Sequence, residues 1–202
     1  MIAVLDHGIG NLRSAEKALQ RAGGDAVLVS RPEDAAGAAG VVLPGVGAFG
    51  ACRAALAATG LDRVVVGAVG AGVPFLGICV GLQLLYEGSD EDPGVPGLGL
   101  LPGRVRALPP GVKSPQMQWN VVCSRPGRVS HLLAACPSPA WVYFVHSYAP
   151  EVTEETVATC DYGGPVAAVV ERGALWATQF HPEKSGPVGL GLLANFVRAC
   201  QG

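Results

Sequence analysis

A cysteine at position 79 stands between two glycines, in the stretch Pro74-Phe-Leu-Gly-Ile-Cys-Val-Gly-Leu-Gln83. Where a strand turns sharply into a helix, a nucleophile occupies a strained turn, and flanking glycines let neighbouring backbone pass. The N–H groups at the helix start favour the reactive thiolate, and the N–H of Val80 would face a developing oxyanion. The pattern predicts a nucleophilic cysteine; the alternative is a buried structural thiol in a βα turn.

His181 is the histidine best placed to act as the base for such a nucleophile. It lies at the end of the strand-like segment Trp176-Ala-Thr-Gln-Phe180 and precedes Pro182, which holds it in an extended conformation. Glu183, two residues later, can bond the second ring nitrogen and fix the tautomer. The segment predicts a Cys79–His181–Glu183 triad, with a surface histidine in a strand-end turn as the alternative reading of His181 alone.

The segment Pro44-Gly45-Val46-Gly47 follows another strand-like run. Loops at the carboxyl ends of parallel strands form the active crevice, so we expect this loop to face Cys79. Its backbone amides are candidates for a second oxyanion donor, and a peptide flanked by glycines rotates at low steric cost. We hypothesise that the Val46 N–H changes orientation when a partner binds. The alternative is an ordinary βα turn.

The elements that must position these residues change character along the chain. The first half alternates short apolar strands (2–5, 26–29, 41–43, 75–78) with helical patterns (12–22, and a helix beginning over 80–86). The second half contains four strand-like segments (141–148, 156–160, 166–171, 175–180) and a closing helix (187–200). Alternating strands and helices predict an α/β protein with a mostly parallel sheet covered on both faces.

Composition excludes several classes of function. A chain of 202 residues fits one domain, and a net charge of −2 without a basic run argues against a nucleic-acid partner. The six cysteines show no CxxC or CxxH spacing, so we expect no zinc site and no redox dithiol. A chain of this length does not need disulfides, and no signal peptide is visible, so we expect a reducing cytoplasm.

Two segments invite other readings. The uncharged stretch 64–86 is long enough to span a bilayer, but its glycines and Pro74 favour a helix, a turn and a strand. The turn after the first strand carries Gly8-Ile-Gly10, yet Arg13 stands where a dinucleotide fingerprint needs glycine. We therefore expect neither a membrane span nor a nucleotide cofactor.

Together, these segments resemble the class I (triad-type) glutamine amidotransferases, from the first strand to the last helix. The two signatures of that family are similar to Phe75–Gln83 and to Gln179-Phe-His-Pro-Glu183. Further segments resemble the glutaminase subunits of imidazole glycerol phosphate synthase: Asp6–Ser14, Pro44–Gly47, Met117–Asn120 and Val145–Tyr148. The resemblance implies a flavodoxin-like, three-layer fold with extra antiparallel strands, and a single domain over residues 1–202.

The resemblance also implies the chemistry and the roles of single residues. Cys79 would attack the side-chain amide of glutamine, and the ammonia would pass to a cyclase subunit that makes imidazole glycerol phosphate and AICAR in histidine biosynthesis. The heterodimer would need no cofactor and no metal. By the same match, the oxyanion donors would be Val46 and Val80, the glutamine ligands Gly47, Gln83, Glu91, Ser147 and Tyr148, and the partner face Asn11, Trp119, Tyr143 and Lys184.

The chain departs from the family pattern at three positions. His7 stands where the family usually has Tyr, Gln116 where it has His, and Gln118 where it has Gly. None belongs to the triad, so we expect the departures to affect partner-facing detail rather than the chemistry.

Three rival functions remain open on the sequence. One is an amidotransferase subunit of another pathway, such as anthranilate synthesis, against which the N-terminal turn and Met117–Asn120 argue. A second is a cysteine hydrolase of the α/β-hydrolase type, but in that fold the acid precedes the histidine. The third is a non-catalytic regulatory subunit, which the intact Cys79, His181 and Glu183 disfavour.

Overall fold

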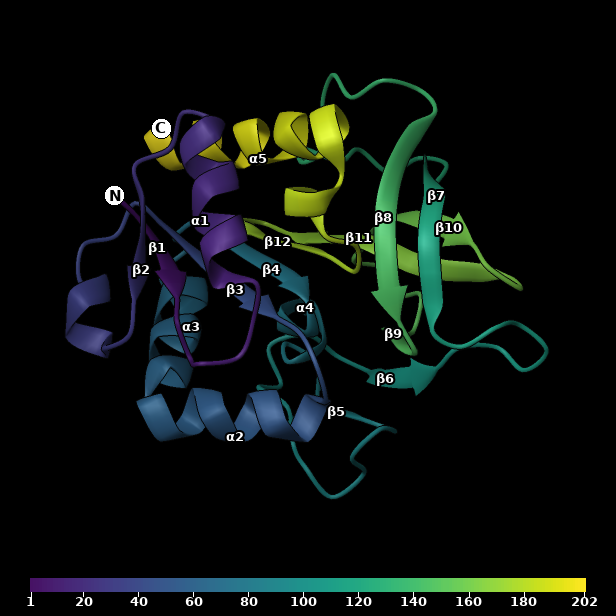
Figure 1. The fold of residues 1–202 in the computed structure, drawn as a ribbon, viewed down its shortest axis with the longest axis horizontal. Helices are drawn as coiled ribbons and strands as arrows, with labels where there is room; N and C mark the ends of the chain where they lie inside the picture. Colours follow the sequence, from purple (N-terminus) through teal and green to yellow (C-terminus); the bar gives the residue numbers. More distant parts are fainter.

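A nine-stranded sheet runs through the computed structural model, which describes residues 1–202 (Figure 1). Its strand order is β2-β1-β3-β4-β12-β11-β10-β7-β8. The first five strands in this order are mutually parallel. They are β1 (Ile2–Leu5), β2 (Ala26–Val29), β3 (Gly40–Gly45), β4 (Phe75–Cys79) and β12 (Leu175–Thr178). These strands are almost entirely buried, as expected for parallel strands covered on both faces.

The other four strands of the sheet are antiparallel and come from the second half of the chain. They are β7 (Gln116–Ser124), β8 (Ala140–His146), β10 (Thr156–Asp161) and β11 (Pro165–Arg172). A small second sheet contains β5 (Gly88–Ser89), β6 (Arg104–Ala107) and β9 (Tyr148–Pro150). In Figure 1, β7 and β8 form a long hairpin at the side of the molecule opposite β2.

Helices cover the two faces of the parallel strands (Figure 1). On one face, α1 (Leu12–Arg21) packs beside α5 (Gly186–Gln201), and on the other α2 (Phe49–Thr59) packs beside α3 (Leu61–Gly70). Leu12, Ala15 and Leu19 are buried on one side of α1, at the helical spacing that the sequence predicts. The short elements are η1 (Pro32–Ala35), α4 (Val80–Gln83) and η2 (Pro182–Lys184).

The strands expected in the first half and the closing helix are confirmed, but two expectations were wrong. The helix that begins at Val80 ends at Gln83 rather than continuing to Tyr86. The carbonyls of Leu84, Leu85 and Tyr86 instead accept N–H groups from residues 98–101, which fold back over this segment. The expected strand 141–148 is two strands, β8 and β9, separated at Ser147.

The uncharged segment 64–86 folds as the end of α3, a turn, strand β4 and α4. No helix of the structure has both the length and the apolar character needed to cross a bilayer.

Candidate active site

Three neighbouring parallel strands bring the candidate catalytic residues to one edge of the sheet. Cys79 ends β4, Val46 follows β3, and His181 follows β12. Strand β4 pairs with β3 on one side and with β12 on the other. Because all three strands point the same way, their carboxyl ends meet, as ligand sites in open α/β sheets require.

The turn at Cys79 is strained and closely packed. Its φ of 55° lies in the left-handed region, which residues other than glycine rarely occupy. A Cβ on Gly81 would lie 1.9 Å from the carbonyl oxygen of Leu43, and one on Gly77 would lie 3.1 Å from the main chain of Gly81. The flanking glycines therefore let β3, β4 and α4 approach one another, and Cys79 is held where α4 starts.

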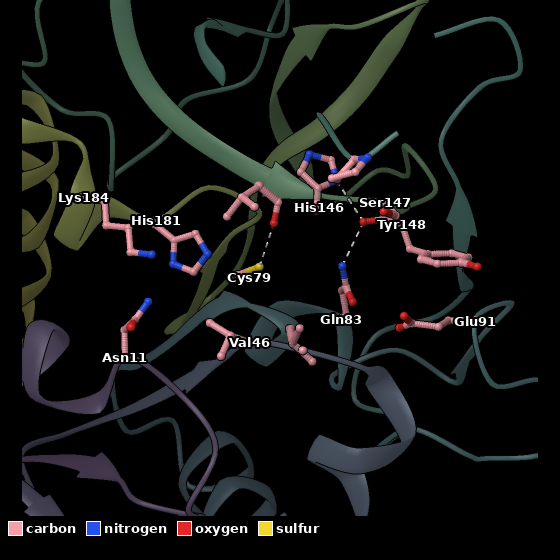
Figure 2. A pocket seen from close by; sticks show the side chains of 14 residues that line it. Asn11, Val46, Cys79, Gln83, Glu91, His146, Ser147, Tyr148, His181 and Lys184 are labelled. Carbon is pink, nitrogen blue, oxygen red and sulfur yellow. Dashed lines mark hydrogen bonds between the residues drawn. The ribbon is translucent and has the colours of Figure 1, made fainter. Parts of the chain in front are cut away.

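His181 and Glu183 form a buried pair. The ring Nδ1 lies 2.7 Å from Glu183 Oε1, and each side chain is 2% exposed. His181 Nε2 has no hydrogen-bond partner, and Figure 2 shows the ring beside Cys79. Burial alone would lower the pKa of His181, but the Cys79 sulfur beside the ring and the bond to Glu183 outweigh burial and raise the pKa to about 10. A protonated ring next to the sulfur favours the thiolate.

The main chain of His181 is fixed by strand β8. The His181 N–H donates to Tyr143 O at 3.0 Å, and the Tyr143 N–H donates to Ser185 Oγ at 3.0 Å. The Ser185 hydroxyl in turn donates to His181 O at 2.6 Å. Ser185, which is buried, therefore joins the histidine segment to β8, a role that the sequence analysis did not predict.

The loop after β3 is held differently on its two sides. On one side, a Cβ on Gly45 would lie 2.9 Å from Gly81 N, so Gly45 is packed against the Cys79 turn. On the other side, Gly47 has a φ of +87° and open space around it. The Cys52 thiol donates to Val46 O at 3.1 Å, and burial raises the pKa of Cys52 to about 11, which keeps this donor protonated. Only the Gly47 side of the loop has the freedom that the sequence analysis expected of both glycines.

A cavity of about 390 Å³ opens over these turns (Figure 2). Three of its lining residues were not among the predicted site residues, namely Pro115, Val145 and His146. The predicted residues that line it are Asn11, Val46, Gly47, Cys79, Val80, Gln83, Glu91, Ser147, Tyr148, His181 and Lys184. Asn11 and Lys184, expected at the partner face, thus belong to the wall of the pocket, where Figure 2 shows them next to His181.

Two predicted glutamine ligands are anchored by main-chain groups. Gln83 Nε2 donates to Tyr148 O at 2.9 Å. Glu91 accepts the Phe49 N–H at 2.9 Å, and Asp92 accepts the Gly50 N–H at 2.8 Å, so both carboxylates cap the start of α2. A carboxylate and an amide oxygen on this side of the pocket suit the α-amino group of an amino acid.

Two further polar side chains near Cys79 were not predicted as site residues. Gln179 is fully buried, and its Nε2 donates to Cys79 Sγ at 3.7 Å. His146 Nδ1 lies 3.0 Å from Tyr148 O, and burial lowers the pKa of His146 to about 4, so this ring is neutral. Both residues belong to segments that the sequence analysis singled out, Gln179–Glu183 and Val145–Tyr148, and that adjacency was the available signal.

Trp119 and Tyr143 lie outside the pocket, on the β7–β8 hairpin. They are paired in register, with ring centroids 6.1 Å apart in an edge-on arrangement. The alternation of a strand places Met117 on the face of Trp119, and Trp141 on the face of Tyr143. Met117, Trp119 and Trp141 are about half exposed. We call this surface (Met117, Trp119, Trp141 and Tyr143) the aromatic face.

Two of the three departures from the family pattern are placed differently from what we expected. His7 and Gln116 are buried, so neither faces a partner, whereas Gln118 is exposed on β7. Burial lowers the pKa of His7. No group of three or more His, Cys, Asp or Glu side chains is arranged to hold a metal ion.

Comparison with known proteins places the chain in a family. The family model described as "Glutamine amidotransferase class-I" matches residues 3–200. The chain is 49% identical to imidazole glycerol phosphate synthase subunit HisH of Symbiobacterium thermophilum, covering 98% of this chain and 93% of that protein. It is 48% identical to the protein of the same name from Methanothermobacter thermautotrophicus, with 98% of each covered.

Solved structures share the fold. A crystal structure of a glutamine amidotransferase superposes with a TM-score of 0.75 at 22% identity and covers 100% of this chain and 99% of that one. The PurLQS structure from Thermotoga maritima superposes with a TM-score of 0.74 at 18% identity, covering 98% and 97%. The chain therefore belongs to the class I glutamine amidotransferase family and, within it, to the HisH subunits of imidazole glycerol phosphate synthase.

Proposed function

We propose that Cys79, His181 and Glu183 hydrolyse glutamine, and that the ammonia passes to a cyclase subunit docked against the aromatic face. The observation that carries this proposal is the buried His181–Glu183 pair beside a cysteine held at a strained turn, in a pocket lined by Gln83 and Glu91. The proposal rests on this geometry together with the relatives named as synthase subunits.

Acylation begins from a thiolate beside a protonated imidazole. Cys79 Sγ attacks the carboxamide carbon of glutamine, and the electron pair of the C=O bond moves to the oxygen. Val80 is the first residue of α4, so its N–H has no partner within the helix; this N–H and the Val46 N–H are the two proposed donors to the oxyanion. His181, whose pKa is raised to about 10, carries the proton that the departing ammonia takes.

Deacylation returns the site to its starting state. Neutral His181 takes a proton from water, and the hydroxide attacks the thioester carbon. The intermediate collapses, the C–S bond breaks, and the electron pair leaves on Cys79 Sγ. Glutamate departs, and the imidazolium–thiolate pair is restored. Glu183 keeps the ring oriented through both steps by its bond to Nδ1.

The aromatic face supports a partner on this side of the molecule. Exposed Trp and Tyr side chains typically anchor interfaces because they bury a large rigid area. The face lies on the hairpin whose inner end, Val145–His146, lines the pocket with Lys184 and Asn11. A cyclase docked there covers the pocket mouth, where ammonia would otherwise reach water and become ammonium.

We also propose that residues 1–202 form one domain that works in the cytoplasm. A single hydrophobic core joins residues from Ile2 to Val197, which supports one domain. All six cysteines are free thiols, which suits a reducing compartment.

The test is glutamate release by the purified chain, alone and with a cyclase subunit and its ligand. Cys79→Ala should abolish glutamine hydrolysis, while the cyclase in the same complex still runs on ammonium salts. The matched control is Cys123→Ala, which removes an exposed thiol outside the pocket and should leave hydrolysis unchanged. Glutamine hydrolysis that survives in Cys79→Ala would overturn the mechanism.

The partner surface has a separate test by titration calorimetry. Trp119→Ala should weaken cyclase binding by at least about tenfold, as truncation of an aromatic anchor does. Val129→Ala, at an exposed position in the loop between β7 and β8, is the control and should bind normally. Equal affinity of the Trp119→Ala variant and the wild type would place the cyclase elsewhere.

A further inference from the structure

Gln179 makes a contact with the reacting sulfur that the triad does not account for. It follows β12, it is fully buried, and its side-chain nitrogen lies 3.7 Å from Cys79 Sγ. Its side-chain oxygen accepts a hydrogen bond from Gln83 Nε2 at 3.2 Å. Gln179 and Cys79 are 100 positions apart in the chain, so only the fold brings them into contact.

The orientation of the Gln179 amide is fixed by its neighbours. Tyr148 O is a carbonyl and can only accept, so the Gln83 side chain must turn its nitrogen toward it, at 2.9 Å. The same nitrogen donates to Gln179 Oε1, which leaves Gln179 Nε2 toward the sulfur. Turning either amide over would place two donors or two acceptors face to face. The chain of bonds from Tyr148 through Gln83 therefore determines that an N–H donor points at Cys79.

An N–H donor matters most when the sulfur carries a negative charge. Hydrogen bonds to ionised acceptors are shorter and stronger than those to neutral ones. The neutral thiol can instead turn its S–H toward Val145 O, which lies 4.0 Å away. The sulfur of a thioester is a weak acceptor, so the contact with Gln179 favours the two states in which Sγ is anionic: the resting nucleophile and the thiolate expelled on deacylation.

We propose that Gln179 is a further catalytic residue, which donates to the Cys79 thiolate and is oriented by Gln83 and Tyr148. The proposal deepens the proposed glutaminase mechanism and rests on it. Because Tyr148 and Gln83 also line the glutamine pocket, the bond chain joins the wall of the substrate site to the nucleophile. A buried side chain that only filled space would lack this directional contact.

The test measures thiolate character without needing turnover. Alkylation of Cys79 by iodoacetamide is followed by mass spectrometry of the Cys79 peptide, at about pH 7 and about pH 10. Gln179→Met keeps the volume and removes the donor. We expect about a tenfold slower alkylation near pH 7 and a rate close to wild type near pH 10, since the lost bond is to a charged acceptor.

The matched control is Gln116→Met. Gln116 is also fully buried, and its Nε2 donates to the sulfur of a different buried cysteine, Cys160, at 3.9 Å. The control therefore loses the same kind of amide–sulfur contact away from the nucleophile. It should leave Cys79 alkylation within about twofold of wild type at both pH values, because Gln116 donates to Cys160 and not to the Cys79 sulfur. A loss shared by both variants would show that Gln179 acts only through packing.

Kinetics provide the second readout. Gln179→Met should lower kcat by about tenfold with little change in KM, because the contact stabilises charge on sulfur rather than bound glutamine. If that variant does not fold, Gln179→Glu carries the test, because a carboxylate beside Sγ should slow alkylation near pH 7 still further. Alkylation at the wild-type rate in the folded variant overturns the proposal. Failure of the cyclase to stimulate hydrolysis would count against the proposed function and leave the alkylation result standing.

Discussion

The two sides of the active-site pocket are built on different principles. The side made by β3, β4 and β12 holds its residues by shape, because the glycines around Cys79 leave no room for a Cβ. The side made by β8 and β9 holds its residues by hydrogen bonds, through the carbonyls of Tyr143, Val145 and Tyr148. Close packing of the main chain therefore fixes the position of Cys79, and hydrogen bonds to main-chain carbonyls fix the orientation of the side chains around it.

Among the variants that test this comparison, we expect the largest effect from Gly81→Ala, which tests the close packing around Cys79. The new Cβ would lie 1.9 Å from Leu43 O, and both groups belong to main chain that cannot move aside. We expect a loss of at least about 3 kcal/mol in the free energy of unfolding and no measurable glutaminase activity. Urea denaturation and glutamate release measure the two effects.

The control is Gly67→Ala in α3, where a Cβ meets nothing within 4 Å. Replacing glycine inside a helix removes backbone freedom from the unfolded chain, so this variant should gain about 0.5–1 kcal/mol. If Gly81→Ala is as stable as Gly67→Ala, shape does not hold the Cys79 turn.

The side of the pocket made by β8 and β9 can be tested by lowering the pH, because it contains His146. Burial lowers the pKa of His146 from 6.5 to about 4. Below pH 6.5, His146 is protonated in the unfolded state but stays neutral in the folded state. The free energy of unfolding therefore falls as the pH drops toward 4, and it levels off below that pH. The pKa difference corresponds to about 3 kcal/mol at most over this window.

The measurement is urea denaturation of wild type and His146→Gln at about pH 7 and about pH 4.5. Neutral glutamine removes the proton uptake, so the variant should lose less stability than wild type on acidification. Parallel losses in the two proteins would show that His146 does not contribute to the acid sensitivity of the fold.

A smaller effect is expected at the loop after β3. Gly47 has open space but a φ of +87°, so Gly47→Ala strains the backbone by about 1–2 kcal/mol without a clash. Because the loop carries the Val46 donor, kcat should fall by about tenfold while the fold persists. Gly37→Ala meets the same conditions far from the pocket, with a φ of +71° and open space, and should lose stability but not kcat. Equal kcat values for Gly47→Ala and Gly37→Ala would show that the loop after β3 does not contribute to catalysis.

The sequence was sufficient for features determined by short segments. Cys79, His181 and Glu183 lie in two continuous stretches, and the strands of the parallel half are plain apolar runs. Strand β7 was missed because its pattern is inverted: Gln116 is buried, while Met117 and Trp119 are exposed. A strand that presents its apolar side chains outward does not show the usual alternation.

The contacts of Gln179 and Ser185 could not be predicted, because each depends on a partner distant in the chain. Gln179 reaches Cys79 across 100 positions, and Ser185 reaches Tyr143 across 42. Nothing in the local sequence of either residue specifies that partner. The same reason explains why the place of Asn11 and Lys184 in the pocket wall was not predicted; their expected contact with a partner stays a prediction.

The bond between the His181 N–H and Tyr143 O has a consequence for how docking can be observed. That amide is protected from hydrogen–deuterium exchange only while β8 stays against the histidine segment. The Tyr143 side chain belongs to the aromatic face. A protein that binds this face and shifts β8 would therefore lengthen or shorten the hydrogen bond between the His181 N–H and Tyr143 O. The exchange rate of one backbone amide, that of the proposed catalytic residue His181, is therefore expected to report contact at the surface of the hairpin.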